Sequence, residues 1–241
     1  MNVAIIGYGR MGKEIEKVLE KRGHLIVSKI DKNNFDKIQN LNSQNIDVAI
    51  EFTNPNSAYK NILNCFEANI PVVSGTTGWT DKLSELKEKS FKEKKGFLYA
   101  SNFSIGVNIL FALNKKLAQV MNNYPEYSAS IEETHHTKKL DSPSGTAITL
   151  AEGVIKNLDM LDSWAETNTP AKKTIGVKAY REGEVPGIHK VKYDSTFDTL
   201  QISHSAKSRE GFALGAVLAA EFMQNKRNYF EMKDVLKLNS L

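Results

Sequence analysis

The 241-residue sequence has a single cysteine, six prolines and no apolar run long enough to cross a membrane. Because Cys65 has no second cysteine to pair with, no disulfide can form within the chain, which is typical of a reducing compartment. No charged leader precedes the first apolar run, and no stretch approaches the roughly 18 apolar residues of a membrane span. We therefore expect a cytoplasmic protein with no membrane partner.

An excess of charge of one sign is also missing. The chain has 32 Lys and Arg against 28 Asp and Glu, a net charge of +4. It lacks the dense clusters of basic residues that nucleic-acid binders use, so we expect no nucleic-acid partner. The small positive excess is compatible with an anionic cofactor and substrate. A composition of 41% hydrophobic and 25% charged residues is typical of a globular protein, and the length allows one large domain or two modest ones.

The N-terminal stretch has the pattern of a dinucleotide-binding site. The apolar run 2–6 predicts a strand buried on both faces, and G-x-G-x-x-G follows it as Gly7-Tyr8-Gly9-Arg10-Met11-Gly12. An amphipathic helix and a second strand, 25–30, then lead to Asp31. The glycines allow close approach of a pyrophosphate, the helix N-terminus stabilises its charge, and Asp31 can accept from ribose hydroxyls. The alternative, a glycine-rich turn without a ligand, does not explain the acidic residue at this spacing.

The neighbour of Asp31 leaves the choice of nicotinamide cofactor open. An acidic residue at this position favours NADH, whereas the adjacent cation of Lys32 can balance the additional phosphate of NADPH. We expect the protein to use NADH or NADPH, with measurable use of both.

The alternation of strands and helices continues up to about residue 104. Strands are predicted at 46–50, 71–73 and 97–100, with helices between them. Each strand ends in a turn, and these turns are Glu51–Pro55, Gly75–Trp79 and Ala100–Phe103. Because ligands of open α/β sheets bind at the carboxyl ends of the strands, we expect the turns to line one crevice with the glycine fingerprint.

The pattern changes after Ser104. A long helix is predicted at 105–121 and a strand at 127–131, and three alternating runs at 177–181, 188–193 and 200–204 indicate antiparallel strands with one wet face. The segment 158–173 is polar with little periodicity, which predicts a mobile loop.

A final apolar helix begins at Arg209, and we expect it to return to the first domain. The predicted fold is therefore an α/β protein. A Rossmann-type, parallel-sheet dinucleotide-binding domain, 1–104 plus 213–241, is interrupted by an α+β domain, 105–212, for substrate binding and oligomerisation.

One stretch, 132–147, concentrates the residues that carry proton chemistry. It contains His135, His136 and Lys139 on a predicted strand-to-helix loop, followed by Ser142-Pro143-Ser144-Gly145-Thr146. Ser142 or Ser144 can cap the helix that follows, and the N–H groups of a helix start can bind a carboxylate. The alternative is an ordinary strand end, with one histidine packed, the other solvated and the lysines in water. If the helix start does bind a carboxylate, the stretch places proton donors beside an anion site, which suits an enzyme acting on a small carboxylic acid.

With these residues assembled, the whole chain resembles the dihydrodipicolinate reductase family of the diaminopimelate route to lysine. The most specific matching run is His135-His136-x-x-Lys139-x-Asp141-x-Pro143-Ser144-Gly145-Thr146-Ala147. Further matches are Gly7–Gly12, Glu51-Phe52-Thr53, Gly75–Gly78, Ser101–Asn108, His204-x-Ala206-x-Ser208-Arg209 and Phe212-Ala213. The sequence departs from the family at Glu51, where Asp is frequent, at Ser142, where Ala is frequent, and in its somewhat shorter loops.

The resemblance implies an NAD(P)H-dependent reductase of a small cyclic dicarboxylate, assembled as a homotetramer and without a metal. His135 would be the acid/base residue and Lys139 a proton donor, while His136, Gly145 and Thr146 would hold the substrate. The implied cofactor contacts comprise Gly7 to Gly12, Asp31, Lys32 and two later turns. These turns contribute Gly75, Thr76, Thr77, Ala100, Ser101, Asn102 and Phe103.

Two rival functions share parts of this pattern. Another NAD(P)-dependent oxidoreductase, similar to an aspartate dehydrogenase or an imine reductase, would share the first domain without needing the block from His135 to Thr146. A non-catalytic NAD-binding sensor, whose second domain only dimerises or binds a partner, gives no reason for His135, Lys139 and Ser144–Thr146 to cluster on one loop.

Overall fold

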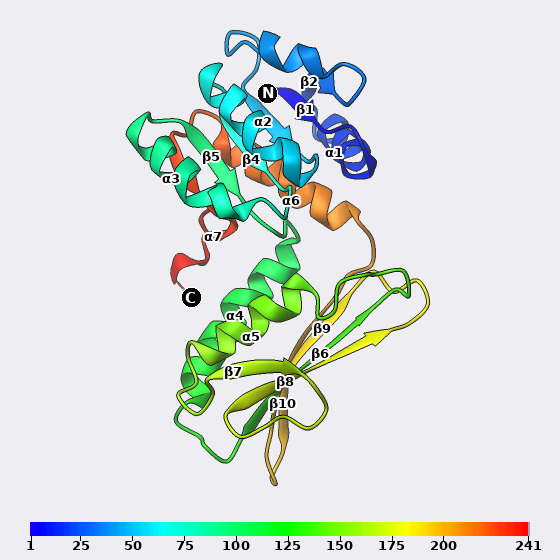
Figure 1. The fold of residues 1–241 in the computed structure, drawn as a ribbon, viewed down its shortest axis with the longest axis vertical. Helices are drawn as coiled ribbons and strands as arrows, with labels where there is room; N and C mark the ends of the chain where they lie inside the picture. The colour runs from blue at the N-terminus through cyan, green and yellow to red at the C-terminus, as the bar shows by residue number, and fades with distance from the viewer. Residues whose placement is uncertain (241) are drawn as a thin grey trace. The chain divides into compact units, whose positions relative to one another are not determined.

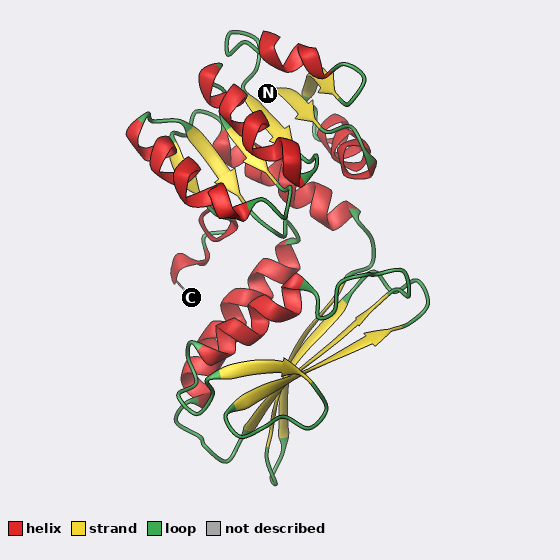
Figure 2. Cartoon of the chain, in the orientation of Figure 1, coloured by secondary structure: helices red, strands yellow, loops and turns green. Residues whose placement is uncertain are grey.

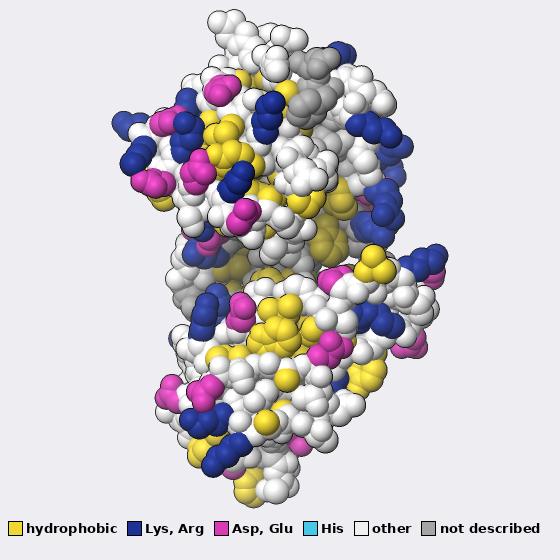
Figure 3. All heavy atoms as spheres, viewed as in Figure 1, with side chains coloured by type: hydrophobic (Ala, Val, Ile, Leu, Met, Phe, Trp, Pro, Cys, Tyr) yellow, Lys and Arg dark blue, Asp and Glu magenta, His cyan; other side chains and the backbone are white. Residues whose placement is uncertain are grey.

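The structure is a computed structural model that describes residues 1–240, with Phe35, Asp36 and Ser240 described by their backbone alone. The chain divides into two units (Figure 1). Unit 1 consists of Met1–Ile105 and Arg209–Asn239, and unit 2 of Gly106–Ser208. On the face drawn in Figure 3, both signs of charge occur on each unit, in line with the small net charge. Among the described residues, no helix is both long and apolar enough to span a membrane.

Unit 1 contains a six-stranded sheet in the order β11-β5-β4-β3-β1-β2, and every pairing in it is parallel. The strands are β1 (Asn2–Ile6), β2 (Leu25–Ile30), β3 (Val48–Glu51), β4 (Val72–Ser74), β5 (Gly96–Tyr99) and β11 (Asn228–Phe230). The first five match the predicted strands, and the parallel sheet confirms the predicted fold class. The sixth, β11, was not predicted, because three residues carry no periodic pattern.

Helices cover both faces of this sheet (Figure 2). They are α1 (Arg10–Lys21), α2 (Pro55–Glu67), α3 (Leu83–Lys92), α6 (Glu210–Met223) and α7 (Met232–Val235), with 3₁₀ turns at Phe35–Asn40, Thr80–Lys82 and Leu238–Ser240. Successive side chains of β1 point to opposite faces. Val3 and Ile5 therefore pack with residues of α1 and α6, whereas Ala4 and Ile6 pack with residues of α2 and α3.

Unit 2 contains a mixed five-stranded sheet in the order β10-β9-β6-β8-β7. The strands are β6 (Ser128–His135), β7 (Ser163–Glu166), β8 (Thr174–Arg181), β9 (Ile188–Asp194) and β10 (Thr199–Ser205). The helices α4 (Ile105–Met121) and α5 (Gly145–Ile155) lie along one face of the sheet (Figure 1). That face and the two helices share an apolar core that includes Leu110, Ile131, Leu150 and Val191.

Two sequence-based expectations for unit 2 are wrong. Strand β8 was expected to be antiparallel, but it pairs parallel with both β6 and β7. Side-chain alternation shows that a strand has one buried face and carries no information on its direction. The segment 158–173 was expected to be a loop, yet Ser163–Glu166 forms the edge strand β7. A four-residue edge strand with no buried side chain lacks the hydrophobic run by which strands are recognised.

The close approach of α6 to the turn after β5 requires a glycine. A Cβ added at Gly215 would lie 1.8 Å from the backbone oxygen of Phe103, whereas one added at Gly211 on the same helix would meet nothing within 4 Å. Gly215→Ala should therefore destabilise the protein by roughly 1–3 kcal/mol through overpacking. Gly211→Ala should be neutral, or stabilising by up to about 1 kcal/mol, because alanine favours the helix. Urea unfolding of both variants measures the difference, and equal effects would contradict the close packing of α6.

Candidate active site and nucleotide cavity

The core face of β6 becomes polar towards the end of the strand. Ile131, Glu133 and His135 point to the same face because they are two residues apart. Ile131 lies in the apolar core of unit 2, whereas Glu133 and His135, 1% and 7% exposed, follow it along the strand. The strand thus places a carboxylate and an imidazole next to the hydrophobic interior, at the edge of the core.

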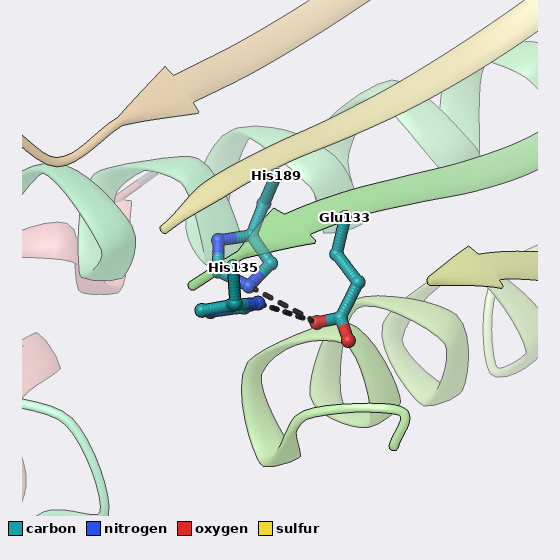
Figure 4. A group of neighbouring side chains, drawn as sticks. All are labelled: Glu133, His135 and His189. Atoms are coloured by element: carbon teal, nitrogen blue, oxygen red, sulfur yellow. Dashed lines mark ion pairs between the residues drawn. The ribbon is translucent and has the colours of Figure 1, made fainter. Parts of the chain in front are cut away.

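Strand register brings two further side chains to this place. Glu133 lies opposite His189 on the antiparallel neighbour β9, and His135 lies opposite Arg181 on the parallel neighbour β8. Figure 4 shows both imidazoles directed at one oxygen of Glu133. The distances from Oε2 to His135 Nδ1 and to His189 Nε2 are both 3.5 Å, and the two rings meet edge to face.

The same carboxylate holds the start of α5. The Ser144 N–H donates to Glu133 Oε1 at 3.0 Å, and the Ser144 hydroxyl donates to Oε2. Ser144 is also the helix cap, because its Oγ accepts from the Ala147 N–H at 3.2 Å; of the two serines predicted as caps, it is the one that serves. Arg181 approaches Oε1 at 3.4 Å and donates to the backbone oxygen of Asp141 at 2.7 Å. The loop between β6 and α5 is therefore fixed at Asp141 and at Ser144.

These contacts decide the charges of the cluster. Burial alone would raise the pKa of Glu133, but hydrogen bonds from His189 and Ser144 outweigh it and lower the pKa to about 2. Burial lowers the pKa of His135 to about 4, against the opposing attraction of the Glu133 charge. At neutral pH, Glu133 is therefore ionised and His135 is neutral.

Glu133, His135 and His189 could also ligate a metal ion, because their ligand atoms lie within 4.8 Å of one another. Both carboxylate oxygens, however, already accept hydrogen bonds from Ser144, and the guanidinium of Arg181 adds a positive charge beside them. A second cation there would be repelled by Arg181 and would have to displace the serine. We therefore interpret the three side chains as a cluster in which the Glu133 charge, held by Ser144 and Arg181, attracts both imidazoles.

Lys139 lies further along the same loop. Its ammonium contacts the two carboxylate oxygens of Asp141 at 2.7 and 2.9 Å, and its side chain is 20% exposed. The side chain of the adjacent Lys138 is 81% exposed and reaches only Glu184 at 3.7 Å. The two neighbouring lysines are thus in different environments, and only Lys139 is partly enclosed beside the cluster.

The predicted substrate-binding residues lie on either side of this loop. His136 is half-buried directly after β6, and Gly145 and Thr146 open α5. The first turn of α5 contains no acidic residue, and a Cβ at Gly145 would meet nothing within 4 Å. A helix start that is capped by serine and open at its glycine suits an anion.

A glycine leaves space beside Nε2, the other ring nitrogen of His135. A Cβ on Gly187, whose φ is +156°, would lie 3.0 Å from His135 Nε2, whereas Nδ1 is buried towards Glu133. The glycine at the start of β9 therefore leaves the Nε2 side of the ring unobstructed.

Unit 1 has a cavity of about 330 Å³ at the carboxyl ends of its strands. It is lined by Gly9, Arg10, Met11, Phe52, Thr53, Pro55, Gly75, Thr76 and Thr77, six of which were predicted to contact the cofactor. The structure thus brings together the glycine fingerprint and the turns after β3 and β4, which are far apart in the sequence.

The glycines of the fingerprint turn beside this cavity fit a dinucleotide. A Cβ on Gly7, at φ +98°, would lie 2.0 Å from the oxygen of Phe52, and one on Gly12 would lie 2.3 Å from the oxygen of Gly7. These two glycines allow the turn to close, whereas Gly9 faces open space at the start of α1. The start of α1 has no side-chain cap and no acidic residue in its first turn, so its N–H groups suit a pyrophosphate.

A buried carboxylate organises the turns around the cavity. Glu51, 0% exposed, accepts from the Ser74 hydroxyl at 2.6 Å, from the Thr76 hydroxyl at 2.8 Å and from the Thr53 N–H at 3.1 Å. The rings of Phe52 and Phe103 pack together beside Gly75, where a Cβ would clash with both. The Glu51 carboxylate therefore fixes two turns of the cavity wall.

The remaining predicted cofactor residues of unit 1 are near the ends of other strands, outside the lining of this cavity. Tyr8 donates from its hydroxyl to Glu16 on α1. Asp31 and Lys32 follow β2, where Asp31 Oδ1 accepts from the Asn33 N–H and Lys32 is exposed. Ala100, Ser101, Asn102 and Phe103 follow β5.

Three members of the cluster in unit 2, Glu133, Arg181 and His189, were not predicted from the sequence to have a role. The two-residue spacing of Ile131, Glu133 and His135 could have placed Glu133 on the core face with the acid/base residue. His189 and Arg181 required the strand register, which the sequence does not carry.

Comparisons with known proteins agree with this architecture. A family described as "Dihydrodipicolinate reductase, N-terminus" matches residues 1–103, and one described as "Dihydrodipicolinate reductase, C-terminus" matches residues 106–236. A 4-hydroxy-tetrahydrodipicolinate reductase of Christiangramia forsetii is 52% identical over 238 residues, 98% of each chain. One of Neisseria gonorrhoeae is 34% identical and covers 80% of this chain and 74% of its own.

A solved structure has the same fold. Dipicolinate-bound dihydrodipicolinate reductase from Paenisporosarcina sp. TG-14 aligns with a TM-score of 0.76 at 22% identity, and the alignment covers 96% of this chain and 97% of that one.

The depressed pKa of His135 predicts how stability depends on pH. The unfolded chain takes up this proton near pH 6.5 and the folded chain only near pH 4, so stability falls as the pH drops through this interval. His135→Gln removes the effect, and the stability of wild type relative to this variant should decline by up to about 3 kcal/mol between pH 7 and pH 4. Urea unfolding across this range tests the prediction, with His136→Gln as the control. Parallel curves for wild type and His135→Gln would contradict it.

Proposed function

The chain belongs to the dihydrodipicolinate reductase family, and on this basis we propose the following assignment of its reaction and residues. The protein reduces 4-hydroxy-tetrahydrodipicolinate to tetrahydrodipicolinate with a nicotinamide cofactor, in the diaminopimelate route to lysine. The structural observation that carries the proposal is in unit 2. There a neutral, buried imidazole, a paired lysine and a serine-capped helix start converge on one loop.

The two proton carriers have different roles. The substrate loses its 4-hydroxyl group as water, which gives a conjugated cyclic imine. When bound, a reduced nicotinamide supplies hydride to this imine, which leaves an enamine that has to take up a proton. His135 is neutral at neutral pH, so it has no imidazolium proton to give until its pKa rises. Lys139 is an ammonium paired with Asp141 and therefore has a proton available. We assign proton donation to Lys139, and hydrogen bonding and acid/base exchange at Nε2 to His135.

The substrate carboxylates are held by the helix start and the cations beside it. Backbone N–H groups of Gly145 and Thr146 at the first turn of α5 bind one carboxylate, and His136 contacts the substrate from the other end of the loop. Negative charge brought next to His135 raises the pKa of its imidazole. Binding of a dicarboxylate therefore promotes protonation of the acid/base residue.

NADH or NADPH is the cofactor. The glycine turn from Gly7 to Gly12 and the start of α1 hold the pyrophosphate, and Asp31 accepts from the ribose. Lys32, exposed beside Asp31, is placed to balance the additional phosphate of NADPH. The turns Gly75–Thr77 and Ala100–Phe103 contact the remainder of the cofactor.

A cytoplasmic homotetramer is the proposed state of the protein. The free, buried thiol of Cys65 supports a reducing compartment. The edge strand β10 and the exposed side chain of Leu200 on it support assembly through the sheet of unit 2.

Removal of the proton carriers tests the proposed function. His135→Ala and Lys139→Ala should each lower kcat by about 10²-fold or more, the usual loss for an acid or base, and leave NADH affinity nearly unchanged. The assay is NADH oxidation with the fresh aldolase product of pyruvate and aspartate semialdehyde. The matched control is Lys138→Ala, because Lys138 is solvated beside Lys139. A double variant of His135 and Lys139 that still works at near wild-type rate would end this assignment, as would activity only with oxaloacetate and ammonia.

The role of Lys32 predicts a selective loss. Lys32→Ala should raise the KM for NADPH about 2- to 5-fold, the value of an exposed ion pair, and leave the KM for NADH almost unchanged. Steady-state kinetics with each cofactor measure this, and Lys17→Ala on α1 serves as the control. Equal changes for both cofactors would remove Lys32 from the phosphate site.

A further inference from the structure

The carboxylate of Glu133 joins four segments of unit 2. Oε2 lies 3.5 Å from His135 Nδ1 on β6 and 3.5 Å from His189 Nε2 on β9. Oε1 accepts from the Ser144 N–H before α5 at 3.0 Å and lies 3.4 Å from Arg181 Nη1 on β8. With only 1% of its surface exposed, Glu133 cannot itself reach a substrate, so its effect passes through these neighbours.

We infer that Glu133 is a positioning residue that keeps the proton of the neutral His135 imidazole on Nδ1, leaves Nε2 as a proton acceptor and, through its other oxygen, fixes the start of α5. The inference rests on the proposed function, since it states how the acid/base residue of that reaction is prepared. One buried charge would then set both the proton-exchanging atom and the anion site.

The argument for the tautomer starts from what a carboxylate can do. An ionised carboxylate only accepts hydrogen bonds, whereas a neutral imidazole has one donor nitrogen and one acceptor nitrogen. His135 Nδ1 is buried, and the polar atom facing it is Glu133 Oε2. A lone pair on Nδ1 would be repelled by this charge, and an N–H is attracted by it. The proton therefore belongs on Nδ1, as in other carboxylate–imidazole pairs.

The opposite side of the His135 ring, at Nε2, is arranged for proton exchange. The absence of a side chain at Gly187 leaves room beside Nε2, where a Cβ would stand 3.0 Å away. With Nδ1 protonated, Nε2 presents a lone pair in this space. It can take up a proton when substrate carboxylates arrive, and the charge of Glu133 then stabilises the imidazolium.

The second function of the carboxylate concerns α5. Ser144 donates its N–H to Oε1 and its hydroxyl to Oε2, while its Oγ caps the helix through Ala147. The position of the first turn, with Gly145, therefore depends on the same group as the tautomer. Substitution of Glu133 should disturb both, whereas substitution of Ser144 should disturb only the helix start.

The test is the tautomer of His135, measured from the ¹⁵N shifts of its ring nitrogens at pH 7 in the full chain without added substrate. Wild type should show Nδ1–H. In Glu133→Gln, the Ser144 N–H and Arg181 are fixed donors, so they should hold the amide oxygen at the Oε1 position. The amide NH₂ then faces Nδ1, which has to accept, and the proton should move to Nε2.

Two control variants separate this role from a structural one. Glu132→Gln changes the adjacent glutamate, which points to the other face of β6 and binds Lys192 at 2.9 Å. It should keep the Nδ1–H tautomer and the wild-type kcat. Ser144→Ala removes the helix cap and should lower the unfolding midpoint and raise the substrate KM, with the tautomer unchanged.

The turnover of Glu133→Gln is a second measurement, independent of the tautomer. Glu133→Gln should lower kcat about 10²-fold with NADH affinity unchanged. A wild-type imidazole found as Nε2–H overturns the inference whether or not the variant folds, and so does a Glu133→Gln protein that retains Nδ1–H. If wild type shows Nδ1–H but does not reduce the proposed substrate, the reaction is wrong and the positioning role stands.

Discussion

An ionised carboxylate can be buried only if donors reach its oxygens, and this requirement organises the site in unit 2. Glu133 meets it with a serine from the start of α5, an arginine from β8 and imidazoles from β6 and β9. Four segments must therefore arrive at one point before the charge is tolerated. Loss of any of them leaves a buried charge short of a donor, so the loop between β6 and α5 is held in a single arrangement.

The same constraint recurs in unit 1. Glu51, at the end of β3, receives donors from Ser74, Thr76 and Thr53, and so joins the turns that line the nucleotide cavity. In both units the carboxylate lies where a strand leaves the apolar core and a loop of a candidate ligand site begins. A hydrophobic core alone would leave such loops free to vary, because they contribute few buried apolar contacts.

Much of the architecture could be predicted from the sequence. The apolar run of β1, the glycine fingerprint and Asp31 were sufficient for the parallel sheet and its dinucleotide cavity. The direction of β8 and the existence of β7 and β11 could not be predicted, since alternation carries no direction and strands of three or four residues carry almost no pattern. His135 and Lys139 could be proposed from their motif. Glu133 could have been placed beside His135 by its spacing on β6, but His189 could not, because its contact depends on the register between β6 and β9.

The charges of the cluster explain how the proposed proton carrier, His135, can be buried beside the candidate anion site at the start of α5. A protonated imidazole in this position would attract any anion, and keeping it charged inside the protein would carry a large desolvation cost. Burial instead lowers the pKa of His135 to about 4, so the ring is neutral in the folded structure. The positive charge of this loop beside the cluster is that of Lys139. In the proposed reaction, the arrival of two carboxylates raises the pKa of the ring, and Glu133 supplies the countercharge. Proton uptake by His135 would then be a consequence of substrate binding.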